Sequence, residues 1–186
     1  MVLASAALLG SAALSGSTTL ATGQDAAEEL KPGLIAEFFN IGKPMEEFPV
    51  IPAERKPDLR RIDRKINFEN TTDTFPGTDM SDHFYVRWTG KVRIPRDGKY
   101  TFFTESDDGS RLWIDGKVVV DNGGLHAMEE KSGELELKAG DHDLKMELFE
   151  NDGEVGCKLS WESASMPKEI LSDAALNHKK DKDLDK

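Results

Sequence analysis

Residues 106–116 of this chain read SDDGSRLWIDG, and the Asp115-Gly116 pair at the end of that stretch indicates how the chain folds. An Asp-Gly pair accepts the positive φ angles that the tight turn of a β-hairpin requires. The pair lies between two short runs, RLWI at residues 111–114 and KVVV at residues 117–120. Two antiparallel strands are therefore predicted to meet at Asp115-Gly116.

Apolar and polar residues alternate with a period of two on both sides of this hairpin, which is typical of strands with one buried face. The alternation is clearest at residues 84–88 (FYVRW), 144–148 (LKMEL) and 155–161 (VGCKLSW). Turn signals such as Asp-Gly and Gly-Gly separate these runs at short intervals. Short strands spaced in this way predict an all-β sandwich or barrel.

Two stretches break the pattern. Residues 48–65 are rich in prolines and charges and predict a long connecting loop, after which Ile66 and Phe68 would begin a strand. Pro167 would suit the first turn of a short helical segment over residues 167–175.

Large side chains and the cysteine indicate the core. Trp88, Cys157 and Trp161 share the apolar phase of their strands, so burial is expected for all three. Trp113 is out of phase with its apolar neighbours, so its role is open. A core position is favoured over stacking on a sugar.

The charge balance narrows the classes of partner. The 186 residues include 35 acidic and 24 basic side chains, which gives a net charge of -11. That surplus repels phosphate backbones and anionic lipids, so it argues against nucleic acid and against docking on membranes, and it leaves carboxylates free for a hard cation. A single cysteine excludes an internal disulfide and a multi-cysteine zinc site.

The two ends of the chain differ in composition from the middle. Residues 1–24 carry no charge and contain an Ala/Leu-rich run that fades into Ser, Thr and Gly, as in a signal peptide; a disordered leader is the alternative. Export would make the protein secreted, periplasmic or cell-surface, without membrane insertion after signal removal. Residues 178–186 alternate charges and predict a disordered tail. The folded domain is expected at residues 31–177.

Several motifs occur in an informative order. GLIAEFF opens the domain at residues 33–39, followed by FYVRWTG at 84–90, GKYTF at 98–102, the stretch at 106–116, and LSW at 159–161. With these motifs the chain resembles the protective-antigen fourteen-kilodalton domain, or PA14 domain, over about residues 32–177. The resemblance implies a jelly-roll-like antiparallel β-sandwich, a fold found in adhesins, in toxins and as an insert in glycosidases. It implies glycan recognition as the usual role.

The resemblance also implies a site. In the calcium-dependent lectins of this family, two adjacent aspartates in one loop and an asparagine from a second loop hold the ion, and sugar hydroxyls bind the ion directly. The matching residues are Asp107 and Asp108 in the first loop and Asn151 in the second. The chain departs from these lectins because it lacks their disulfides and because its second loop, residues 150–154, is short.

Each candidate residue also has an ordinary structural interpretation. Calcium prefers several oxygen ligands, and two neighbouring aspartates can face one ion only in a loop. In a plain polar turn, Asp107 and Asp108 would instead cap backbone amides, and Asn151 would be a turn residue of Asn-Asp-Gly. His126 follows a Gly-Gly pair in a loop that would border the binding face, so it is either a carbohydrate contact or a solvated loop residue.

The sequence contains no phosphate-cradling glycine loop and no nucleophile elbow, and its acidic residues are too numerous to single out a glycosidase pair. The first hypothesis is therefore a secreted, non-enzymatic, lectin-like module that binds a glycan or polysaccharide, with calcium as its cofactor. The alternative is a structural or protein-partner-binding module of the cell surface that lacks a lectin site. A hydrolase fragment ranks third.

Overall fold

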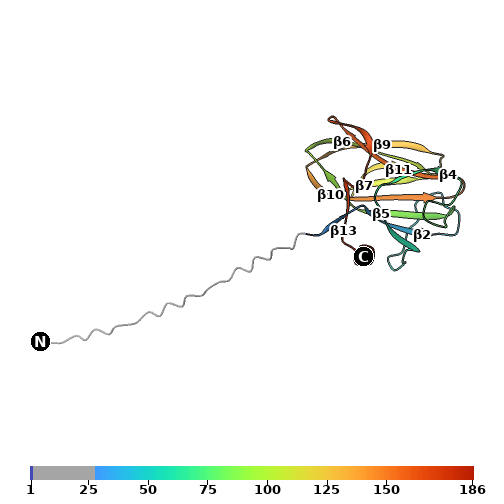
Figure 1. Ribbon diagram of the computed structural model, residues 1–186, viewed down its shortest axis with the longest axis horizontal. Helices are drawn as coiled ribbons and strands as arrows, with labels where there is room; N and C mark the ends of the chain where they lie inside the picture. The colour runs from blue at the N-terminus through green and yellow to red at the C-terminus, as the bar shows by residue number, and fades with distance from the viewer. Residues whose placement is uncertain (2–27) are drawn as a thin grey trace.

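The computed structural model describes Met1 and residues 28–186, and these residues form thirteen β-strands and no helix (Figure 1). The strands are β1 (Leu30–Pro32), β2 (Leu34–Asn40), β3 (Leu59–Asp63), β4 (Asn67–Thr71), β5 (Phe84–Ile94), β6 (Gly98–Asp107), β7 (Ser110–Ile114), β8 (Lys117–Asn122), β9 (Glu129–Leu137), β10 (Gly140–Glu150), β11 (Val155–Ser163), β12 (Met166–Ile170) and β13 (Leu176–Lys179). Apart from Met1, the predicted signal segment at residues 1–24 lies outside the described residues. The described part of the chain offers no helix with the length and apolar character needed to cross a membrane.

The strands form two antiparallel sheets, so the predicted all-β sandwich is confirmed. The first sheet follows the order β1-β13-β5-β10-β7-β8, with β2 also paired to β5 and β3 paired to β2. The second sheet follows the order β12-β11-β6-β9, with β4 also paired to β11. Each sheet buries one face against the other, which satisfies the period-two pattern of the sequence.

The predicted hairpin joins β7 to β8. Ile114 pairs with Lys117 across it, and the turn residues Asp115 and Gly116 have φ angles of 49° and 75°. Just before the hairpin the chain changes sheets, because β6 belongs to the second sheet and β7 to the first. The residues that make this crossing are Asp108 and Gly109, so the aspartate pair lies where the two sheets meet.

The core lies between the sheets and contains two of the three tryptophans. Trp88 is 0% exposed and Trp161 is 4% exposed, which confirms both predictions. The indole Nε1 of Trp88 donates a hydrogen bond to Asp63 Oδ2 at 2.8 Å, so its polar atom is satisfied in the core. Trp113 is only half-buried, because it faces away from the core residues on either side of it. Lys145 Nζ lies 3.5 Å from the centre of its ring, outside the core. The favoured core position for Trp113 is therefore wrong.

Strand β3 lies inside the stretch that was expected to be a loop, and it pairs with β2 from Leu59 to Asp63. Its sequence, LRRID, lacks the apolar alternation by which the other strands were predicted. Its charged side chains instead pair with other groups of the fold. Arg60 Nη2 lies 2.7 Å from Asp181 Oδ2, and Arg61 Nε donates to Asp63 Oδ1 at 2.7 Å. Paired charges let a strand form without the apolar alternation that identifies the other strands.

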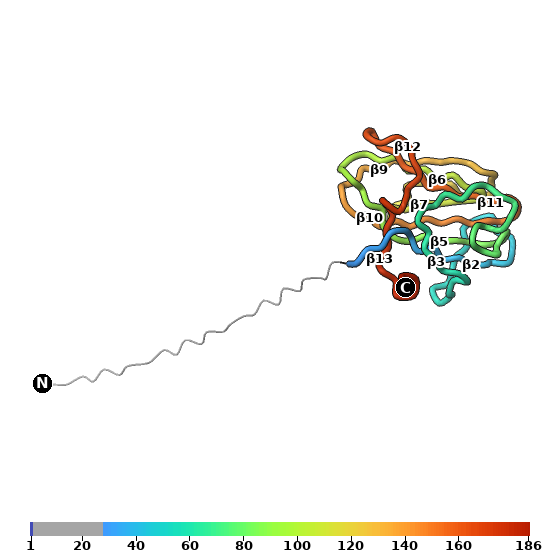
Figure 2. The backbone as a smooth tube through the Cα atoms, viewed as in Figure 1, coloured from blue at the N-terminus to red at the C-terminus, as the bar shows by residue number. Residues whose placement is uncertain are grey.

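The C-terminal part also differs from the sequence prediction. Residues 167–175 contain most of strand β12 in place of a helical segment. Strand β13 passes the expected domain end at residue 177 and buries His178, which is 1% exposed. Beyond β13 the end of the chain lies near β3 (Figure 2). There Asp181 forms an ion pair with Arg60 of β3. The ordered fold therefore extends beyond the predicted boundary into the segment at 178–186.

The thiol of Cys157 provides a test of this packing. Cys157 is fully buried, and burial raises the pKa of its thiol, so the reactive thiolate is suppressed. We expect Ellman's reagent to leave the native protein unmodified and to titrate one thiol after unfolding in urea. A Ser165→Cys variant, at an exposed position, is the positive control. Equal rates for Cys157 and the control thiol in native protein would contradict the packing.

Candidate functional site

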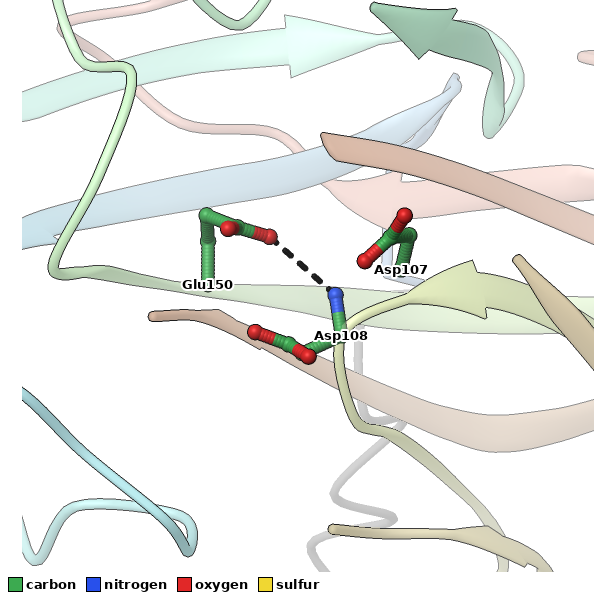
Figure 3. Close-up of side chains that lie close together, drawn as sticks. All are labelled: Asp107, Asp108 and Glu150. Carbon is green, nitrogen blue, oxygen red and sulfur yellow. Dashed lines mark hydrogen bonds between the residues drawn. The ribbon is translucent and has the colours of Figure 1, made fainter. Parts of the chain in front are cut away.

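Three carboxylates converge where β6 gives way to β7 and where β10 ends (Figure 3). Asp107 and Asp108 are each 6% exposed, and the peptide bond between them is cis. Glu150 is the last residue of β10 and is 0% exposed. Each of the three offers a carboxylate oxygen, and these oxygens lie within 4.8 Å of one another. We call these three residues the acidic cluster.

Glu150 was not among the residues singled out from the sequence. It continues the inward phase of β10, in which Leu144, Met146 and Leu148 enter the core. An acidic residue in an otherwise apolar inward phase is the signal that could have identified it, because such a group is seldom fully buried without a partner or a function.

Asp108 joins three segments of the chain through hydrogen bonds. Its Oδ1 accepts the backbone N–H of His126 and its Oδ2 accepts the backbone N–H of Asn151, both at 3.0 Å. Its own backbone N–H donates to Glu150 Oε2 at 3.1 Å. The capping role expected of a plain polar turn is thus present. A carboxylate oxygen accepts more than one bond, so capping leaves both oxygens able to contact a cation.

Ionising all three carboxylates of the acidic cluster is unfavourable in the ion-free protein. Burial, and then the charge of Asp108, raises the pKa of Glu150 to about 9. Burial and the same neighbour also raise the pKa of Asp107. Glu150 Oε1 is buried and has no hydrogen-bond partner among the described residues. A bound cation would offset both the mutual repulsion and the orphaned oxygen, and an all-oxygen donor set suits a hard ion such as calcium.

Asn151 lies beside the acidic cluster, but its side chain turns elsewhere. Its Oδ1 accepts the backbone N–H of Met45 at 2.8 Å, and its Nδ2 donates to Asp152 Oδ2 at 3.0 Å. The contact of Asn151 with the cluster is made by its backbone N–H, which donates to Asp108. Its assignment as a metal ligand stays a prediction.

His126 also approaches the cluster through its backbone. The half-buried imidazole places Nδ1 3.0 Å from the carbonyl oxygen of Ala127 and Nε2 3.1 Å from that of Asn122. The ring therefore contacts carbonyl groups of its own loop, while the backbone N–H of His126 donates to Asp108 Oδ1. Its assignment as a carbohydrate contact likewise stays a prediction.

A groove of about 470 Å³ opens next to the aspartate loop. It is bounded by the loop after β2, by the β7–β8 pair and by the loop after β8, with Glu46, Glu47, Phe48, Arg111, Asp121, Gly123 and Gly124 as its lining. The guanidinium of Arg111 lies 4.5 Å from the centre of the Phe48 ring. The groove adjoins the site because the carbonyl oxygen of Gly124 is 3.0 Å from the point that a Cβ on Gly109 would occupy. Aromatic, donor and acceptor groups therefore lie together beside the acidic cluster.

Comparisons with known proteins identify a family and several relatives. The model of the PA14 domain matches residues 30–174. The anti-sigma-I factor RsgI3 of Acetivibrio thermocellus is 40% identical over 120 residues, which is 62% of this chain and 18% of that protein. This chain thus spans less than a fifth of the length of that relative.

Two solved structures show the same fold. An anti-sigma factor domain-containing protein from Clostridium clariflavum superposes with a TM-score of 0.68 at 32% identity, over 82% of this chain and 49% of the other. The PA14 sugar-binding domain from an RTX adhesin superposes with a TM-score of 0.69 at 19% identity, over 79% of this chain and 98% of the other. At that lower identity the likeness to the adhesin domain shows the fold alone.

Proposed function

Because this chain belongs to the PA14 domain family, we propose that it is a non-catalytic module that binds a glycan through a calcium ion held by Asp107, Asp108 and Glu150. The observation that carries the proposal is the acidic cluster, in which three buried carboxylates meet and Glu150 Oε1 has no partner among the described residues. Asn151 would join these ligands by exchanging its bond to Met45 for the ion. When bound, calcium would supply open coordination positions for sugar hydroxyls.

The surroundings of the cluster support a glycan as the ligand. The adjoining groove is lined by Glu46, by the Arg111–Asp121 ion pair, and by Phe48 as an aromatic surface. Such a mixture of polar groups and an aromatic ring suits a sugar, which presents hydroxyls at its rim and C–H groups on its faces. His126 belongs to the loop that borders this groove, and its backbone N–H holds Asp108 in place. With a predicted signal peptide, the protein would act as a secreted, periplasmic or cell-surface module.

A second candidate function is recognition of a protein partner without a sugar site. The relatives with the higher identities, at 40% and 32%, are named as anti-sigma factors, and that name describes regulation of another protein. In that case the acidic cluster would be structural, and Asp108 would serve only to cap the backbone N–H groups of His126 and Asn151.

A glycan array probed with and without calcium distinguishes the two functions. We expect binding to a defined set of glycans in calcium, loss of that binding in EDTA, and its return when calcium is restored. Because the ion would bind the folded state only, calcium at about a hundred times its Kd should also stabilise the fold by about 2.7 kcal/mol. The matched control replaces calcium by magnesium, which demands a smaller and more rigid octahedral site. An array that is blank in both conditions, with no calcium effect on melting, would contradict the proposal and favour a protein partner.

A further inference from the structure

Behind the aspartate loop the core of the sandwich becomes polar. Ser106 on β6, Ser110 on β7 and Asn122 on β8 are each 0% exposed, and we call these three residues the polar triad. Ser106 Oγ donates a hydrogen bond to Ser110 Oγ at 2.7 Å. The two serines therefore meet across the base of the loop that carries Asp107 and Asp108.

Asn122 connects this contact to the neighbouring loop. Its Nδ2 donates to Ser106 Oγ at 3.2 Å and to the backbone carbonyl of Glu129 at 3.0 Å. Its own backbone carbonyl lies 3.1 Å from Nε2 of His126. The backbone N–H of His126 in turn donates to Asp108 Oδ1. A continuous chain of hydrogen bonds thus runs from the base of the aspartate loop, around the next loop, and back to a carboxylate of the acidic cluster.

Stability of the fold does not account for this arrangement. Buried polar side chains are unfavourable unless every polar atom is paired, and apolar residues of similar size would fill the same space at lower cost. Asn122 Oδ1 has no hydrogen-bond partner among the described residues. The triad is better explained by the geometry that it imposes, since sites held by a rigid supporting shell lose less freedom when they bind.

We propose that Ser106, Ser110 and Asn122 are positioning residues that preset the aspartate loop for the ion. They hold the loop so that its two carboxylates already face Glu150 before the ion binds, and none of the three contacts the ion itself. This inference rests on the ion site proposed above and goes beyond it, because it assigns ion affinity to residues outside the ligand set.

The test is a calorimetric titration of calcium alone into the full chain. We expect Ser110→Ala and Asn122→Ala each to weaken calcium binding about tenfold. In these variants the aspartate loop becomes ordered only when the ion binds, and the cost of that ordering reduces the free energy of binding. Hydrogen exchange in EDTA provides a second readout that needs no ion. The amide of His126 should exchange about tenfold faster in Asn122→Ala, because its loop is released. Wild-type calcium affinity in both variants, or wild-type exchange of the His126 amide in Asn122→Ala, would overturn the proposal.

Two matched controls separate positioning from a general loss of stability. Thr104→Val removes another fully buried hydroxyl of β6, one without a partner among the described residues and outside the triad. Ile114→Val weakens the packing of β7 without touching the triad. We expect wild-type calcium affinity in both, and recovery of affinity in Ser110→Thr, which restores a hydroxyl. Equal weakening by the controls and by Ser110→Ala would overturn the positioning role.

The wild-type titration distinguishes this inference from the function on which it rests. If the wild-type chain does not bind calcium, the proposed ion site is wrong, and so is the positioning role that depends on it. Calcium binding that is the same in wild type and in both triad variants contradicts the positioning role alone.

Discussion

Replacing Asp108 by alanine is expected to abolish calcium binding, with a loss of affinity of at least about a hundredfold. The substitution removes one of the three converging carboxylates and also the two acceptors that hold the backbone N–H groups of His126 and Asn151 at 3.0 Å. The ion would lose a ligand, and two loops of the site would lose their common anchor. Glycan binding that depends on the ion should disappear to the same extent.

Calorimetry with calcium, followed by the glycan array, measures this effect. Asp82→Ala is the matched control, because Asp82 is an exposed carboxylate that accepts the backbone N–H of Gly153 at 3.2 Å and is not part of the acidic cluster. Asp108→Asn adds a finer comparison, since it keeps one side-chain acceptor and removes the charge. Wild-type calcium affinity in Asp108→Ala would exclude the acidic cluster as the ion site and leave Asp108 as a cap.

Much of the fold follows from local patterns in the sequence. The hairpin at Asp115-Gly116 and the buried Trp88 and Trp161 were predictable because turn chemistry and period-two alternation act over a few residues. Strand β3 was not predictable in this way, because it lacks apolar alternation and its Arg60 pairs with Asp181, which is distant in sequence. His178 was taken for part of a charged tail, yet its ring is buried between the carbonyl of Gly33 and Asp185. Local composition does not report such long-range partners.

The candidate site shows the same division. Asp107 and Asp108 could be singled out because they stand in one of the motifs through which the chain resembles the PA14 domain. The phase of β10 could mark Glu150 as buried but not as a neighbour of the aspartate pair, which it reaches only through the pairing of β10 with β7. Asn151 lies beside the acidic cluster, but which way its side chain turns depends on Met45, more than a hundred residues earlier. A sequence motif thus locates a loop, and the tertiary fold selects the groups that complete it.

The substitution Glu150→Gln is expected to have opposite effects on stability in the absence and in the presence of calcium. Burial raises the pKa of Glu150 from an ordinary 4.5 to about 9 in the ion-free protein. Between these values the folded state keeps a proton that the unfolded chain has lost. The free energy of unfolding should therefore fall as the pH rises through this window, by at most about 1.4 kcal/mol per pH unit.

Glutamine has nearly the same shape as the protonated carboxyl group and retains an oxygen that can accept the backbone N–H of Asp108. In EDTA, the variant should therefore lose this pH dependence and be more stable than wild type at pH 8. In calcium the order should reverse, because a neutral amide is a poorer ligand than a carboxylate and the variant should bind the ion at least about tenfold more weakly. Urea unfolding at several pH values, with and without calcium, measures both effects.

Glu147→Gln is the matched control, because Glu147 lies on the opposite face of the same strand and its Oε1 accepts a hydrogen bond from Lys145 Nζ at 2.8 Å. It should alter neither the pH profile in EDTA nor the stabilisation by calcium. The reversal is expected only if burial makes the charged form of Glu150 unfavourable without the ion and if a bound cation requires that charge. If Glu150 merely supported the backbone of Asp108, the glutamine variant would be at least as stable as wild type in both conditions, and the ion site would have to be abandoned.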